Sequence, residues 1–255
     1  MKSFEARRGA RLVLAAAALS LASAGLFAQP PPPAGRGPAN AKAGAPIDIT
    51  GQWVSVVTED WRYRMVTPAK GDYASVPLNA DARKVADAWD PAKDEAAGNQ
   101  CNSYGAPAVM RVPGRIRLSW ADDETMKVET DAGTQTRMFY FKDPKGQGGD
   151  GQGVSAASWD IIGGGRGGPV RGGSMKVVTS KLKAGYLRKN GVPYSDKTTV
   201  TEYFDRFTEP TGDEWFTVTT VVTDPVYLAI PFVTTTDFRK EGDASKWSPS
   251  ACSSR

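Results

Sequence analysis

The chain has 255 residues, a formal net charge of +4 and no histidine. The lack of histidine excludes Ser-His-Asp and Cys-His catalysis, histidine-ligated zinc and the two-histidine-one-carboxylate iron site. Two cysteines are too few for a thiolate zinc or iron–sulfur site. The sequence therefore predicts no metal and no cofactor, and it leaves acid–base chemistry to Asp, Glu, Tyr or Lys.

Residues 1–28 have the features of a secretory signal peptide. A basic start precedes an apolar run that is too short to cross a bilayer comfortably. Small residues offer cleavage after Ala24 or Ala28, and the pair Arg7-Arg8 leaves Tat export open beside Sec export. These features predict a periplasmic or secreted protein with no stable membrane insertion after cleavage.

Cleavage would also remove most of the positive charge. The signal peptide holds four of the 32 basic residues and one of the 28 acidic residues, so 28 and 27 remain, a net charge of +1. A nearly neutral chain has no strong basic field with which to attract phosphate backbones. The sequence therefore predicts that the mature protein does not bind nucleic acid.

Residues 29–46 are rich in Pro, Gly and Ala, which predicts a spacer that buries no core. A single folded domain is then expected over residues 47–255. Cys101 and Cys252 are an even pair in a chain predicted to be exported, which favours a disulfide between them. Such a bond would hold the C-terminal tail against the body of the domain.

The first part of the domain alternates polar and apolar residues. Residues 50–58 and 61–66 each have the period of two that is typical of a strand. Residues 77–98 instead have helical spacing, with Asn79 and Asp90 as expected N-caps of one or two short helices.

The rest of the domain reads as further strands separated by turn signals. A glycine-rich stretch, residues 143–173, is expected to be a long loop with one short strand inside it, and its G-x-G-x-x-G matches lack the βαβ unit of a dinucleotide site. About ten strands predict a mainly β protein, an antiparallel closed or nearly closed barrel. The expected strands are residues 108–112, 115–120, 125–130, 135–141, 154–162, 174–180, 182–188, 198–207, 215–222 and 230–240.

The step Gly51-Gln52-Trp53 on the first strand resembles the lipocalin and calycin fingerprint, which implies a tryptophan that plugs one end of a barrel. Nearly the whole chain is also similar to a family of exported bacterial proteins of unassigned function. That resemblance implies export and a single domain, and it brings no catalytic assignment. It is carried by the stretches GQWVSVVTEDWRYRM, PLNADARKVADAWDPAKDEAAG, MRVPGRIRLSW, ETDAGTQTRMFYF, GYLRKNGVPYS and TEYFDRF.

Arginine, carboxylate and tyrosine side chains recur on the predicted strand faces. Inside a barrel they would form a cavity in which guanidinium groups clamp a carboxylate or phenolate. In that cavity Glu202 or Asp205 would be a general base, and Arg137 would stabilise developing negative charge. The predicted ligand-binding residues are Trp53, Arg62, Tyr63, Arg64, Arg115, Gln135, Tyr140 and Tyr203. Arg111 and Arg117, beside Arg115, belong to the same group of polar strand residues.

Three hypotheses for function follow. The first is an exported barrel that binds a small apolar or aromatic molecule, including one that bears a carboxylate. The second is a cofactor-independent lyase, isomerase or hydrolase that uses Asp or Glu with Arg or Tyr. The third is a structural or interaction protein of the cell envelope, which the Pro-rich spacer mildly favours.

Overall fold

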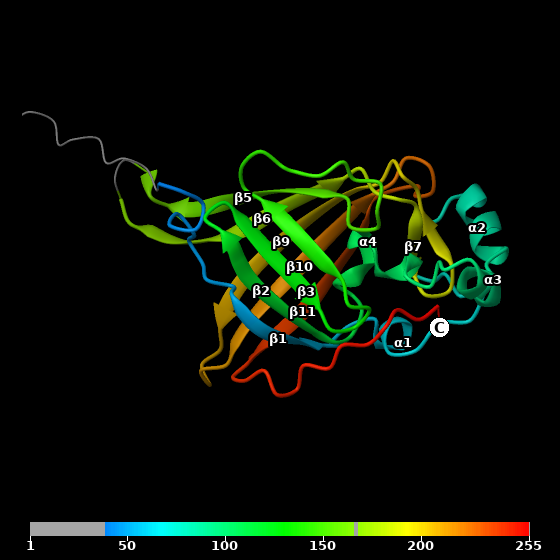
Figure 1. Ribbon diagram of the computed structural model, residues 1–255, viewed down its shortest axis with the longest axis horizontal. Coiled ribbons are helices and arrows are strands. Elements are labelled where there is room, and N and C mark those ends of the chain that lie inside the picture. The colour runs from blue at the N-terminus through cyan, green and yellow to red at the C-terminus, as the bar shows by residue number, and fades with distance from the viewer. Residues whose placement is uncertain (1–38, 166–167, 255) are drawn as a thin grey trace, which may run out of the picture. The chain divides into compact units, whose positions relative to one another are not determined.

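The computed structural model describes residues 39–165 and 168–254, so the predicted signal peptide lies outside the described residues. Within these residues nine strands close into a barrel in the order β1-β11-β10-β9-β6-β5-β4-β3-β2 (Figure 1). The strands are β1 (Gly51–Val56), β2 (Arg115–Asp122), β3 (Thr125–Thr130), β4 (Thr136–Tyr140), β5 (Val154–Gly163), β6 (Val170–Ser180), β9 (Thr199–Thr208), β10 (Glu214–Thr223) and β11 (Phe232–Glu241). The predicted fold class, a mainly β closed barrel, is confirmed.

Closure gives every strand of the barrel two neighbours, so none is left as an open edge. All neighbouring pairs are antiparallel except β4 and β5, which run parallel and pair at two positions, Phe139 with Ser155 and Tyr140 with Ala156. The parallel pair arises because the long connection after β4 returns the chain to the cap end before β5 begins. Residues 41–44 of the predicted spacer form a turn, and Lys42 N donates to Asp123 O at the β2–β3 turn.

Short helices gather at one end of the barrel together with a two-stranded sheet (Figure 1). These elements are α1 (Trp61–Arg64), α2 (Ala80–Asp87), α3 (Pro91–Ala96), the 3-10 helix η1 (Asn102–Tyr104), α4 (Ala106–Val109), β7 (Gly185–Arg188) and β8 (Val192–Tyr194). We call them the cap. A second apolar cluster, which includes Leu78, Ala82, Tyr194 and Phe232, ties the cap to the ends of β9, β10 and β11.

Both predicted N-caps are confirmed. Asn79 Oδ1 accepts from Ala82 N, and Asp90 Oδ1 accepts from Ala92 N at the start of α3. The predicted helical region 77–98 thus resolves into α2 and α3.

Replacing Asp90 with alanine is expected to lower the free energy of unfolding by about 1 kcal/mol, because the first turn of α3 loses its side-chain acceptor. Urea denaturation measures this change. Asp90→Asn keeps the acceptor and should lie within about 0.5 kcal/mol of the wild type. An equal loss in both variants would assign the effect to the charge of Asp90 rather than to capping.

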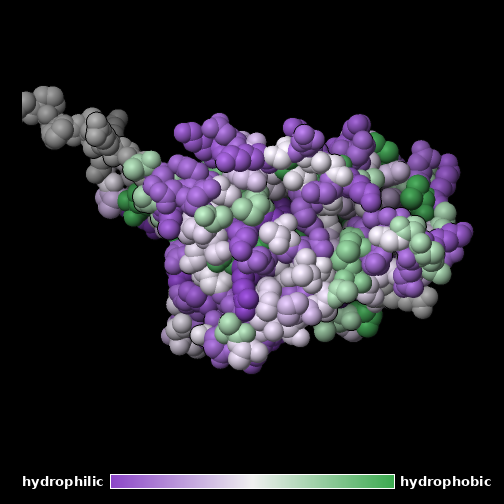
Figure 2. All heavy atoms as spheres, viewed as in Figure 1, coloured by the Kyte–Doolittle hydropathy of each residue, from purple (hydrophilic) through white to green (hydrophobic). Residues whose placement is uncertain are grey.

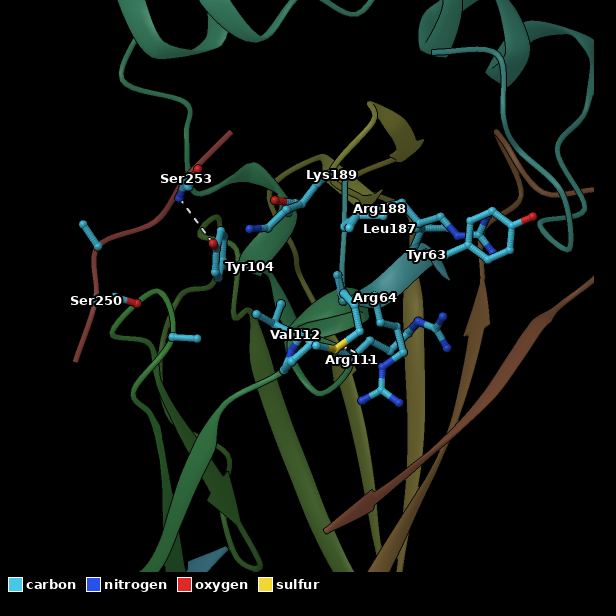
Figure 3. Close-up of a pocket in the computed structure, with 17 residues that line it drawn as sticks. Tyr63, Arg64, Tyr104, Arg111, Val112, Leu187, Arg188, Lys189, Ser250 and Ser253 are labelled. Carbon is cyan, nitrogen blue, oxygen red and sulfur yellow. Dashed lines mark hydrogen bonds between the residues drawn. The ribbon is translucent and has the colours of Figure 1, made fainter. Parts of the chain in front are cut away.

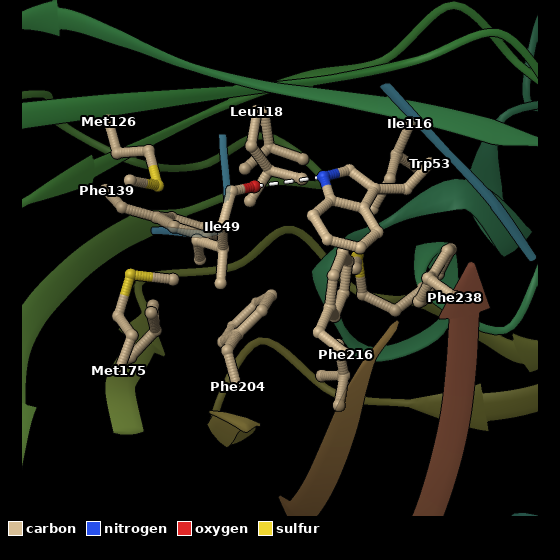
Figure 4. Close-up of a cluster of buried hydrophobic side chains, with 14 of the residues drawn as sticks. Ile49, Trp53, Ile116, Leu118, Met126, Phe139, Met175, Phe204, Phe216 and Phe238 are labelled. Atoms are coloured by element: carbon tan, nitrogen blue, oxygen red, sulfur yellow. Dashed lines mark hydrogen bonds between the residues drawn. The ribbon is translucent and has the colours of Figure 1, made fainter. Parts of the chain in front are cut away.

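Aromatic side chains fill the apolar half of the barrel (Figure 4). Trp53 is fully buried, its Nε1 donates to Ile49 O at 3.0 Å, and its ring meets Phe216 edge-on at 4.7 Å. Phe216 stacks in turn on Phe238, and Phe204 lies against Phe139. These side chains come from inward positions of strands on opposite sides of the barrel, so they fix the register of the strands from which they come.

Between this aromatic cluster and the cap, the inward positions become polar. Buried residues at this level are Arg137, Ser155, Thr179, Glu202, Thr220, Thr234 and Thr236. The barrel interior is therefore layered, with an apolar half away from the cap and a polar layer close to it.

The predicted strand over residues 61–66 is wrong, because Trp61–Arg64 forms the single-turn helix α1. The physical reason is that β1 is already hydrogen-bonded to β2 on one side and to β11 on the other, so no sheet edge is free for a further strand. A strand here would place Trp61 and Met65 together on its apolar face and Arg64 on its cationic face. Arg64 is buried, whereas Trp61 and Met65 are exposed.

Two further elements differ from the prediction. Residues 108–112 do not form a strand, since Gly105 and Pro107 start the helix α4 at that point. The glycine-rich stretch 143–173 is not mainly a loop, because β5 extends to Gly163 and β6 begins at Val170. The two pair as a long hairpin, in which Ile162 faces Gly172. The short strand expected at residues 154–162 is confirmed.

Candidate functional site

A pocket of about 460 Å³ lies where the cap meets the barrel (Figure 3). One wall comes from α1 and the residues after it, a second from α4 and the turn to β2, and a third from β7. The C-terminal segment forms the remaining wall. The lining residues are Tyr63, Arg64, Met65, Val66, Ser103, Tyr104, Ala108, Arg111, Val112, Pro113, Ala132, Leu187, Arg188, Lys189, Ser250, Ala251 and Ser253.

The charge of this lining is one-sided. It contains four basic residues and, among the described residues, no Asp or Glu. Three of the four are arginines that lie more than nine-tenths buried: Arg64 is 8% exposed, Arg111 6% and Arg188 4%. Because burial removes water from a guanidinium, each of these groups needs partners from the protein or from a bound ligand.

Hydrogen bonds hold each guanidinium in place on one side only. Arg64 Nε donates to Arg111 O at 3.0 Å, and its Nη2 donates to Ser55 Oγ on β1. Arg111 Nη2 pairs with Asp60 Oδ2 at 2.8 Å. Arg188 Nη1 donates to Ala74 O at 2.7 Å. These bonds restrain the rotamers of the arginines without using all of their donors.

Four guanidinium nitrogens of this cluster are buried and have no hydrogen-bond partner within residues 39–165 and 168–254. They are Nη1 of Arg64, Nη1 of Arg111, and Nε and Nη2 of Arg188. Nε and Nη2 form one edge of a guanidinium, the edge that makes two parallel hydrogen bonds to an oxyanion. Arg188 therefore keeps an unused guanidinium edge beside a cationic pocket, and such an edge would suit an oxyanion.

The three arginines also act on one another. Burial, reinforced by the nearby charge of Arg111, lowers the pKa of Arg64 to about 10. The same two causes lower the pKa of Arg188 to about 10. Both groups stay charged at neutral pH, and an anion placed among them would relieve their mutual repulsion.

Aromatic and apolar groups complete the pocket. The guanidinium of Arg188 lies 4.2 Å from the ring centre of Tyr63, and Arg62 lies 4.9 Å from the same ring. Met65 and Val66 are 59% and 63% exposed and form an apolar rim, and Figure 2 shows hydrophobic atoms at the surface in the region of α1. Met65 and Val66 also line the pocket itself. The site therefore joins a cationic base to an apolar rim.

The C-terminal wall is held by the predicted disulfide, which the structure contains between Cys101 and Cys252. The chain after β11 runs back along the barrel to the cap (Figure 1), and we call its last described residues, 250–254, the strap. Ser250 N donates to Asp131 O at 2.9 Å, and Ser253 N donates to the hydroxyl of Tyr104 at 3.3 Å. The strap is thus bonded both to the β3–β4 turn and to η1.

Of the predicted ligand-binding residues, the structure brings Tyr63 and Arg64 together in this pocket. Arg62 is beside it, exposed and paired with Asp72 at 2.6 Å. Trp53 lies in the aromatic core instead. The remaining residues are spread over the barrel, so the structure does not gather the predicted set into one cavity.

Four predicted residues are not among those that line the pocket. Arg115 pairs with Glu241 at 2.8 Å. Gln135 donates to Gly133 O and accepts from Gln152 Nε2, close to the disulfide. Tyr140 and Tyr203 are half-buried at positions that alternate with the buried Phe139 and Phe204.

Two of the three predicted catalytic residues lie inside the barrel and the third lies on its outer face. Arg137 and Glu202 face one another in the polar layer, 1% and 0% exposed, with Nη1 to Oε1 at 2.9 Å and Nη2 to Oε2 at 2.6 Å. Thr179 Oγ1 accepts a further bond from Arg137 Nη2. Asp205 is exposed on the outer face of the same strand, β9. Both oxygens of Glu202 are therefore occupied, and Asp205 does not share its compartment.

The sequence-based set omitted two arginines that form the base of the pocket. In the sequence Arg111 is one of several polar residues near Pro113, and the predicted set does not include Arg188. A signal for Arg188 exists in Leu187-Arg188-Lys189-Asn190-Gly191, where two cations come directly before a turn between apolar residues. That pattern alone does not distinguish a buried arginine from a solvated one.

The chain matches no protein-family model, and comparisons with curated proteins and with solved structures found no similar protein. The class of protein is therefore defined by its own geometry, a closed nine-stranded barrel with a cap and a cationic pocket at the capped end. Over residues 39–165 and 168–254, no helix combines the length and apolar character needed to cross a bilayer.

Proposed function

We propose that this is an exported barrel protein that binds a small amphipathic anion at the capped end of the barrel. The observation that carries the proposal is the set of unpartnered, buried guanidinium nitrogens on Arg64, Arg111 and Arg188 around one pocket. Buried donors without partners are costly, and a ligand oxyanion would satisfy them at the moment of binding.

The ligand we infer has an apolar or aromatic body and a carboxylate or similar anionic head. The head would bond to the arginines, and the body would contact Tyr63, Met65 and Val66 at the rim. A pocket of about 460 Å³ has the volume of a small-molecule site. The disulfide supports the proposal of export, since such bonds persist in oxidising compartments. The closed barrel with Trp53 on β1 is in keeping with the calycin resemblance.

The enzyme alternative finds less support in the geometry. Its nominated base, Glu202, has both oxygens bonded to Arg137, and the pair lies in the polar layer rather than among the pocket residues. A binding role needs neither group to be free. We therefore place ligand binding first.

Calorimetric titration with 4-butylbenzoate tests the proposal, with 4-butylbenzyl alcohol as the neutral counterpart. We expect the wild type to bind the anion and to bind the alcohol at least about tenfold more weakly, because hydrogen bonds to charged groups contribute about 1.5–3 kcal/mol. Equal binding of the two compounds would show that the arginines do not select charge.

Arg188→Met is expected to weaken binding of 4-butylbenzoate by about tenfold or more, because it removes the unused guanidinium edge and keeps the length of the side chain. Arg239→Met, at an exposed position near the opposite end of β11, is the matched control and should bind as the wild type does. Circular dichroism establishes that both variants fold. Unaltered affinity in a folded Arg188→Met protein would contradict the assigned pocket.

A further inference from the structure

The number of charges in the pocket bears on the kind of anion that it accepts. Three buried guanidinium groups, Arg64, Arg111 and Arg188, contribute three positive charges. Among the described residues, Asp60 is the carboxylate that bonds directly to one of them, through Arg111. The buried cluster therefore carries two positive charges beyond those offset by direct pairing.

More distant carboxylates reduce this excess only partly. Glu59 and Asp237 act on Arg64 through space, and Asp72 acts on Arg188. Asp72 is paired with Arg62, whereas Glu59 and Asp237 accept from neutral threonine hydroxyls, keep their charges and act on Arg64 only from a distance. A monoanion would leave part of the buried charge uncompensated.

The donors point to the same conclusion. The four unpartnered nitrogens belong to three different guanidinium groups, one of which offers a complete edge. A carboxylate has two oxygens in one plane. A phosphate monoester has three terminal oxygens in a tetrahedral arrangement, so it can accept from three separate arginines at once.

Resting on the proposed function, we infer that the head group of the ligand is a doubly charged, tetrahedral oxyanion, and that the ligand class is an apolar or aromatic phosphate monoester. The three guanidiniums bind its three terminal oxygens. In the bound state its organic group extends out of the pocket alongside Tyr63, Met65 and Val66. No bond is formed or broken in this step.

The experiment compares three probes that share one apolar body: 4-butylphenyl phosphate, 4-butylbenzenesulfonate and 4-butylbenzoate. The sulfonate has three terminal oxygens and a single charge, so it separates the effect of shape from that of charge. At pH 7.5 we expect the phosphate to bind at least about tenfold more tightly than either of the others. Comparable affinity for the phosphate and the benzoate would overturn the inference.

The pH dependence of the affinity is an independent test of the head-group charge, because the protein has no histidine that would titrate in the same interval. Carboxyl, lysine and tyrosine side chains ordinarily titrate outside the interval from about pH 5.5 to 7.5, whereas the second ionisation of a phosphate monoester falls near pH 6. Lowering the pH through this interval should therefore weaken binding of the phosphate towards the level of the sulfonate. Binding of the sulfonate should stay constant. A phosphate affinity that does not change with pH would contradict the need for a dianion.

A variant that changes the charge of the protein, rather than that of the ligand, also tests the charge count. Asp60→Asn removes the directly paired carboxylate, and asparagine tolerates the left-handed backbone at this position, where φ is 50°. We expect this variant to bind the phosphate more tightly than the wild type. A weaker or unchanged affinity would show that charge does not set the preference.

The outcomes separate this inference from the proposed function. If the benzoate binds and the phosphate has no advantage, the pocket binds anions and the inference about the head group fails alone. If none of the three anions binds, both fail.

Discussion

Replacing Glu202 with glutamine is expected to lower the free energy of unfolding by about 3–5 kcal/mol, because it leaves the buried guanidinium of Arg137 without a charged partner. Arg137 lies in the polar layer of the barrel and is 1% exposed, so water cannot replace the lost carboxylate. Urea denaturation followed by tryptophan fluorescence measures the change. Asp205→Asn, on the exposed face of the same strand, should lie within about 0.5 kcal/mol of the wild type.

The double variant Arg137→Met and Glu202→Leu distinguishes the cost of a broken pair from the value of the intact pair. Replacing both charges with apolar groups of similar size removes the desolvation of both ions. We expect this variant to be within about 1 kcal/mol of the wild type or more stable. If the double variant were less stable than Glu202→Gln, the pair would contribute net stability through its bonds to Thr179 and the surrounding layer.

Removing the disulfide is also expected to lower the free energy of unfolding strongly. The bond between Cys101 and Cys252 has a sequence separation of 151, for which the loss of chain entropy in the unfolded state gives at most about 5 kcal/mol. The double variant Cys101→Ser and Cys252→Ser should therefore unfold at a clearly lower urea concentration. Affinity for 4-butylbenzoate should fall as well, because Ser250, Ala251 and Ser253 of the strap form a wall of the pocket.

A reducing agent provides the matched control for this prediction. Dithiothreitol should shift the unfolding midpoint of the wild type to that of the serine variant and should leave the variant itself unchanged. A wild type whose midpoint does not respond to reduction, under conditions where thiol titration shows that the bond is open, would mean that the hydrogen bonds of the strap suffice to hold it.

Local patterns predicted those parts of the fold that depend on neighbouring residues in the chain. The alternation along residues 198–207 and 215–222 predicts β9 and β10, because side chains on a strand alternate between two faces. Asn79 and Asp90 predicted helix starts, because capping is a contact between residues two or three apart. The disulfide also followed from the sequence, since only one pairing of two cysteines exists.

Two of the errors concern whether a neighbouring strand is available for pairing. Residues 61–66 carry a strand pattern, yet strand formation requires a partner, and β1 already has β2 and β11 beside it. The hairpin of β5 and β6 was missed in part for the opposite reason. Its glycines disfavour a strand when taken alone, but ten positions pair across the two strands and support one another.

The sequence by itself determined the β class of the protein, the helix starts, the disulfide and the exclusion of histidine-dependent chemistry, because each depends on composition or on short-range pattern. Only the tertiary structure decided which arginines line the pocket. Arg64, Arg111 and Arg188 come from α1, from the turn after α4 and from β7, and barrel closure brings them together around one pocket. Arg115 and Arg62 have the same chemistry in the sequence, but they are paired with Glu241 and Asp72 outside that pocket. Burial and pairing depend on the three-dimensional arrangement of residues far apart in the chain, which no short-range pattern contains.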